Sequence, residues 1–165
     1  MKKLIRLAAA LLATGLALGV YAASAAPAGA DDTTVTDRGK EMVSMAKQTY
    51  KNEKFGECLD DYGGTINIHT CDESDEQDWT VTRWADGTVQ LKNGLTGDCL
   101  ADTGGSLGTA SKCTTSRYQS WIVKHWADGT MRFKNEATGQ CVEGGSGHEV
   151  WSSESCDSSR EQSWY

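Results

Sequence analysis

The sequence predicts an all-β domain built from three homologous repeats of about 42 residues. A Gln-x-Trp tripeptide recurs at 77–79, 119–121 and 162–164, so the copies lie 42 and 43 residues apart. Two cysteines precede each tripeptide, and the second always lies six positions before the Gln. A repeat of this period is one supersecondary unit whose neighbours bury its apolar face. Because a propeller needs four or more blades, three units indicate a closed β structure with threefold symmetry.

Two β-hairpins are the clearest local elements. The stretches 88–91 (TVQL) and 130–133 (TMRF) alternate apolar and polar residues, as half-buried strands do. Each follows Ala-Asp-Gly, a strong hairpin signal, so 80–84 and 122–126 are expected to be the partner strands. Each repeat is thereby expected to hold four short strands: around its Lys-Asn, around its first cysteine, before its second cysteine and through its Gln-x-Trp.

The first repeat takes its opening strand from residues just before Lys51. Residues 48–50 align with 89–91 and 131–133, so we expect them to close the ring. The domain is predicted to span 47–165, with repeats starting near 51, 92 and 134. Residues 31–46 are largely polar and are expected to form a loose N-terminal arm.

Residues 1–30 have the pattern of a secretory signal peptide. Lys2, Lys3 and Arg6 precede an apolar run over 7–20, and small residues follow it. Cleavage after Ala25 or after Ala30 fits the small-x-small rule. The run is shorter than the ~20 residues that a transmembrane helix needs. The sequence therefore predicts a secreted, extracellular protein.

The charge of the predicted mature chain excludes some partners. Without residues 1–30 it carries 13 Lys and Arg against 23 Asp and Glu, a net charge of −10. Phosphate backbones and anionic lipids repel such a protein, so neither nucleic acid nor a membrane surface is an expected partner. The remaining 135 residues make one ordinary domain.

The six cysteines are expected to form three disulfides in the oxidising compartment that export implies. Six cysteines allow 15 pairings, and the threefold copying selects one pairing within each repeat. A loop of this length is worth ~3 kcal/mol in the chain-entropy model. A metal site is disfavoured because no Cys-x-x-Cys occurs. The expected pairs are Cys58–Cys71, Cys99–Cys113 and Cys141–Cys156.

The repeated C-L-D…C…Q-x-W pattern resembles the ricin B-type lectin family, and the resemblance covers 47–165. It implies a β-trefoil, in which the Gln-x-Trp residues form the structural framework: the Trp fills the shared core and the Gln ties a turn. These residues are Gln77, Trp79, Gln119, Trp121, Gln162 and Trp164.

The resemblance also implies shallow sugar pockets, at most one in each repeat. Four positions count: an Asp two residues after the first cysteine, a polar residue and an aromatic one before the second cysteine, and an Asn before the Gln. The first repeat has Asp60, Asn67, His69 and Glu76 there. A carboxylate, an amide and a flat ring suit a pyranose, although Glu76 departs from the Asn.

The other two repeats match these positions poorly. The second has Ala101, Thr109, Ser111 and Tyr118, and the third has Glu143, Ser152, Glu154 and Glu161. Neither set offers an aromatic platform at the expected place. The sequence therefore predicts at most one good sugar pocket, in the first repeat.

Two functions from different classes follow. The first is a secreted carbohydrate-binding protein. The alternative is a protein-binding trefoil, acting as an inhibitor or as the adaptor subunit of a secreted toxin or enzyme assembly. No cofactor or metal is expected. No catalytic activity is expected either, because the only nucleophile motif, Gly-x-Ser-x-Gly at 104–108, falls in a loop rather than in a strand-to-helix turn.

Overall fold

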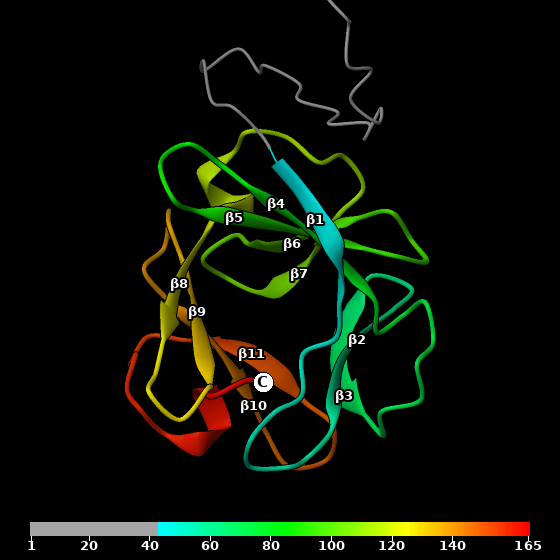
Figure 1. Cartoon of the computed structure of the whole chain (residues 1–165), viewed down its shortest axis with the longest axis vertical. Coiled ribbons are helices and arrows are strands. Elements are labelled where there is room, and N and C mark those ends of the chain that lie inside the picture. Colours follow the sequence, from blue (N-terminus) through cyan, green and yellow to red (C-terminus); the bar gives the residue numbers. More distant parts are fainter. Residues whose placement is uncertain (1–42) are drawn as a thin grey trace, which may run out of the picture. The chain divides into compact units, whose positions relative to one another are not determined.

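In the computed structural model, which describes residues 43–165, the chain is almost entirely β-structure (Figure 1). The predicted signal peptide and most of the predicted arm lie outside these residues. Two 3-10 helices, η1 (Arg117–Gln119) and η2 (Arg160–Gln162), precede the second and third Trp of the repeat. The strands are β1 (Val43–Gln48), β2 (Cys58–Tyr62), β3 (Thr65–His69), β4 (Trp79–Arg83), β5 (Val89–Asn93), β6 (Cys99–Asp102), β7 (Leu107–Ala110), β8 (Trp121–His125), β9 (Met131–Asn135), β10 (Cys141–Gly144) and β11 (Val150–Ser153).

The threefold symmetry is visible in the pairing of each repeated Trp. Trp79 lies between Gln48 and Asn93, and Trp121 lies between Val89 and Asn135. Trp164 likewise pairs with Met131 on one side and with Asn52 on the other. The segment 48–52 therefore joins the first repeat to the third, and the predicted closure of the ring is confirmed.

Three hairpins, β2–β3, β6–β7 and β10–β11, form the second part of each repeat (Figure 1). Their second strands β3, β7 and β11 contact one another. The predicted hairpins around Asp-Gly are present as β4–β5 and β8–β9. The first two repeats have four strands each, the third has three strands and the bridged Trp164, and together they make the β-trefoil that the sequence predicted.

The first strand starts earlier than expected. β1 begins at Val43 and runs beside β4, with Val43 opposite Arg83 and a bulge between Ser44 and Lys47. Residues 43–46 of the predicted arm belong to this strand. The other two copies turn at the equivalent place, whereas here β1 continues along β4 as the last strand of the sheet.

The three repeated Trp side chains form the centre of the core. Each is 0% exposed, and each indole donates from Nε1 to a backbone carbonyl in the hairpin that precedes it. The acceptors are Leu59, Leu100 and Val142, at 3.1, 3.0 and 3.3 Å. Burial of an indole without losing its hydrogen bond explains why Trp occupies this position in all three copies.

The Gln of each tripeptide closes one turn in the same way. Gln77 accepts from the backbone N–H of Asp72 and donates to the carbonyl of Thr70. Gln119 and Gln162 make the corresponding pairs of bonds. The three predicted disulfides are present and cross-link this turn to the first strand of each hairpin, with Cα–Cα distances of 5.1, 5.3 and 5.5 Å.

A repeated Asn connects the copies to one another. Asn93 donates its amide to the carbonyl of Glu76 at 2.7 Å, and Asn135 donates to the carbonyl of Tyr118 at 2.8 Å. In both cases the acceptor belongs to the preceding copy and comes just before its Gln. Sequence reasoning noted the repeated Lys-Asn but gave its Asn no role.

Candidate functional site

Three of the four residues predicted to line the first pocket, Asp60, Asn67 and His69, lie on one side of the β2–β3 hairpin. Asp60 is directly opposite Asn67, and Cys58 is opposite His69, so these side chains share a face. The other face carries Leu59, Ile66 and Ile68, which are buried in the core. Because successive side chains of a strand point to opposite faces, these polar side chains lie on the face of the hairpin away from the core.

Asp60 is the most enclosed member of this group. It is 5% exposed, and its Oδ2 accepts from Nε2 of Gln77 at 3.4 Å and lies 3.6 Å from Nδ1 of His69. Its Oδ1 is buried and has no hydrogen-bond partner among residues 43–165. Burial raises the pKa of the Asp60 carboxyl, with Glu76 adding to the effect, while Gln77 and His69 oppose it.

Glu76 reaches the site from the turn before Gln77. Its backbone carbonyl accepts from the N–H of Asp61 and from the side chain of Asn93, so its position is fixed from two sides. The negative charge of Glu76 helps to raise the pKa of the Asp60 carboxyl. A Glu at this position offers only acceptors when ionised.

The third repeat completes one edge of this site, which sequence reasoning missed. His148 packs edge-on against His69, with ring centroids 5.1 Å apart. Its backbone carbonyl accepts from Ile68 N–H at 3.0 Å, and Glu149 pairs with Asn67. Spacing within one copy carries no information on such a contact between copies.

The second repeat lacks a comparable cluster. Ala101 replaces the carboxylate, and the residue opposite it is Gly108 rather than the expected Thr109. Gln119 instead pairs with Gln90, whose Nε2 donates to its Oε1 at 3.2 Å. No side chain at these two positions offers a hydrogen bond to a ligand.

The third repeat holds more than the sequence indicated. Glu143 is opposite Trp151, not Ser152, because one extra residue separates β11 from the second cysteine in this copy. Trp151 is 40% exposed and packs over Gly145, where an added Cβ would come within 2.2 Å of its ring. Glu143 accepts from Gln162 at 2.7 Å, as Asp60 does from Gln77.

The Ser of the Gly-x-Ser-x-Gly motif and the two remaining Trp residues take no part in these clusters. Ser106 lies in the turn between β6 and β7, where the Thr103 N–H donates to its carbonyl. Trp126 packs under the ammonium of Lys124, 3.8 Å from the ring centroid, whereas Trp84 is buried. Within 43–165, no group of His, Cys, Asp and Glu is arranged to hold a metal ion. None of the helices in this range is long and apolar enough to cross a bilayer.

Solved structures share this fold at low sequence identity. The designed threefold-symmetric protein ThreeFoil is 16% identical, with a TM-score of 0.64 over 72% of this chain and 95% of its own. SeviL, solved with asialo-GM1 saccharide, is 16% identical, with a TM-score of 0.61 over 73% and 94%. A mosquitocidal holotoxin is 18% identical, with a TM-score of 0.64 over 72% of this chain but 16% of the toxin.

At this level of identity the solved structures establish only the fold, whereas a match to a sequence family establishes the family. No curated protein sequence matches the chain. Residues 47–164, however, match the ricin-type β-trefoil lectin domain, and this range includes all three repeats and all six cysteines. The chain is therefore a member of the ricin-type β-trefoil lectin family.

Proposed function

We propose that this protein is a secreted, non-enzymatic carbohydrate-binding protein whose main pocket lies on the β2–β3 hairpin. The observation that carries the proposal is the unpaired Oδ1 of Asp60, inside a cluster of groups that suit hydroxyls. A buried acceptor without a donor is costly, and a sugar hydroxyl supplies the missing donor. The half-exposed His69 ring lies beside the same carboxylate, with its Nδ1 3.6 Å from Oδ2.

The surrounding side chains match a pyranose in number and kind. The Asn67 amide both donates and accepts, the Glu76 carboxylate accepts, and the imidazoles of His69 and His148 offer ring edges and faces. SeviL, which shares the fold, was solved with a saccharide, and this supports a glycan as the ligand class.

The third repeat supports a second, weaker pocket. The half-exposed Trp151 ring provides a stacking surface beside Glu143, and an indole face is a good platform for the C–H face of a sugar. Two pockets on different repeats would give multivalent binding to a polymer, with an avidity above either affinity.

A glycan array with the oxidised protein tests the main pocket. The wild type is compared with Asp60→Asn, which keeps the side-chain shape and removes the charge. Asp98→Asn is the matched control, because the third repeat has Gln140 at the equivalent position and thus accepts an amide there. We expect Asp60→Asn to lose the wild-type signal and Asp98→Asn to keep it.

The result also separates the two function classes. If Asp60→Asn binds glycans as the wild type does, the pocket is misassigned. If no protein form binds any glycan, the alternative gains support: a trefoil that binds a protein, as an inhibitor or as an adaptor subunit. The holotoxin neighbour, in which the shared fold covers 16% of the chain, makes the second role a concrete candidate.

A further inference from the structure

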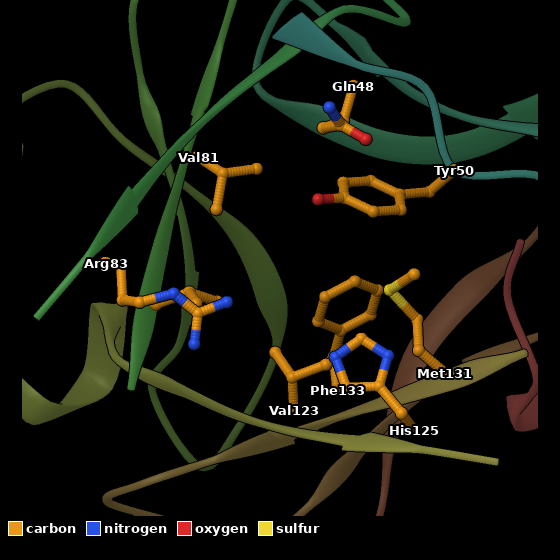
Figure 2. Close-up of a pocket in the computed structure, with 9 residues that line it drawn as sticks. Gln48, Tyr50, Val81, Arg83, Val123, His125, Met131 and Phe133 are labelled. Atoms are coloured by element: carbon orange, nitrogen blue, oxygen red, sulfur yellow. The ribbon is translucent and has the colours of Figure 1, made fainter. Parts of the chain in front are cut away.

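A cavity of about 120 Å³ lies away from the β2–β3 hairpin and is lined by residues of other strands (Figure 2). It is bounded by strands β4, β5, β8 and β9 and by residues 48–50. Trp79, at the start of β4, bonds to the hairpin that carries Asp60, whereas Arg83 ends the same strand at the cavity. Four residues of strand span ~13 Å, so the cavity is separate from the lectin site.

Most of the residues that line the cavity are apolar. Val81, Val89 and Phe133 line it and are at most 6% exposed. Tyr50 packs edge-on against Phe133, with ring centroids 4.9 Å apart. A preformed apolar cavity of this kind favours a hydrophobic ligand body, and the aromatic pair favours a ring.

One polar group lies at the cavity wall. Tyr50 is 4% exposed, and its side chain lines the cavity. Figure 2 shows its hydroxyl pointing over the cavity. Burial raises the pKa of Tyr50, so the hydroxyl stays protonated and remains a donor. A ligand in the cavity can accept a hydrogen bond from this hydroxyl.

A second donor lies at the opening. Arg83 is exposed and makes no ion pair or hydrogen bond with the part of the chain that the structure describes. The three other arginines of this part each have an acceptor: Arg117 bonds to Glu136, Arg132 to the carbonyl of Asp157, and Arg160 to Glu53. In Figure 2 the Arg83 guanidinium faces the cavity, and His125 lies near it. In a chain with an excess of acidic residues, a cation that has no carboxylate partner among residues 43–165 suits an anionic ligand.

We propose that this cavity binds a small aromatic carboxylate with a single ring, whose carboxylate meets Arg83 and the Tyr50 hydroxyl while its ring packs against Phe133. An apolar cavity of about 150 Å³ accepts one benzene ring. The cavity of about 120 Å³ is somewhat smaller, so a single ring is the largest body that we expect it to take, with the charged group in the opening.

Phenylacetate and its neutral isostere phenylacetamide are suitable probes. Methyl groups that line the cavity, on Val81, Val89, Val123 and Met131, give signals that NMR follows during a titration of the whole mature protein. We expect shifts confined to these methyls and at least ~10-fold tighter binding of the carboxylate, since the charge-assisted bond is lost with the amide. Equal affinity for the two probes would overturn the proposal, and so would the absence of shifts at about 10 mM phenylacetate.

Matched variants identify the groups responsible. Arg83→Gln is expected to weaken phenylacetate binding by ~10-fold or more, whereas Arg117→Gln, which removes an equal charge elsewhere, leaves it unchanged. Val123→Phe fills the cavity and is expected to abolish binding while the disulfides and the thermal transition persist. Equal losses in the two arginine variants would mean a nonspecific charge effect and would overturn the assignment. Asp60→Asn is expected to retain phenylacetate binding, which keeps this result independent of the lectin site.

Discussion

Asn52 donates its side-chain amide to the backbone carbonyl of Glu161, 109 residues away in the sequence, at 2.8 Å. Its Oδ1 accepts from the backbone N–H groups of Lys54 and Phe55, and the side chain is 0% exposed. One buried amide thus ties the start of the domain to the last repeat. The corresponding Asn93 and Asn135 make the same link between the other copies.

Asn52→Ala is expected to lower the free energy of unfolding by about 2–3 kcal/mol, because it leaves one carbonyl and two N–H groups without their partner. Urea unfolding of the oxidised protein measures this change. Asn67→Ala is the control, since its amide is partly exposed and makes only one weak bond, of 3.4 Å, within its own hairpin. Equal stability of the two variants would contradict the role of Asn52.

Asp60→Asn is expected to raise the melting temperature at pH 7 and to have little effect at pH 3. The pKa of Asp60 is raised above its ordinary value of 3.8, so the folded protein holds this proton more tightly than the unfolded chain does. Its contribution to stability is therefore greatest at low pH and decreases as the pH rises from 3.8 through the raised pKa. At pH 7 the enclosed carboxylate destabilises the fold, and the amide removes that cost. At pH 7, a melting temperature of Asp60→Asn below that of the wild type would contradict this expectation.

Gly144→Ala is expected to destabilise the fold by ~1–3 kcal/mol. A Cβ at this position would lie 2.9 Å from Nδ2 of Asn52, which its hydrogen bonds hold in place. Gly105→Ala is the matched control, because a Cβ there meets nothing within 4 Å. Thermal unfolding of both variants distinguishes a specific clash from a general effect of losing a glycine.

Trp151→Ala is expected to change the free energy of unfolding by less than about 1 kcal/mol, whereas Trp121→Ala costs about 3–5 kcal/mol. The difference follows from exposure, which is 40% for Trp151 and 0% for Trp121. If the third repeat binds sugar, Trp151→Ala also reduces retention on a polysaccharide column. A large stability loss in Trp151→Ala would assign its ring to packing instead.

The fold could be predicted from the sequence because the motifs that indicate it occur three times. Gln-x-Trp and the cysteine pairs are fixed in number and spacing, and they determine the three disulfides and the buried indoles. The alignment of 48–50 with the later strands also located the closure of the ring. Local periodicity sufficed for β4–β5 and β8–β9, whose turns carry Asp-Gly.

The candidate site could be predicted only in part, for two physical reasons. Trp151 was missed because strand pairing, not distance from a cysteine, decides which side chain stands opposite Glu143, and one extra residue shifts the count. His148 was missed because it reaches His69 from another copy. The cavity near Tyr50 has no motif at all, since its walls are ordinary core positions of several strands.

Each cystine lies within one repeat, so no covalent bond holds the ring closed. Lys51 and Tyr165 exchange backbone hydrogen bonds of 3.2 and 2.9 Å at the seam, beside the Asn52 link. Tension applied between residues 43 and 165 therefore loads these non-covalent bonds first. The ring would open at the seam while each repeat kept its own cross-link, so the protein has a defined point of mechanical weakness that oxidation does not protect.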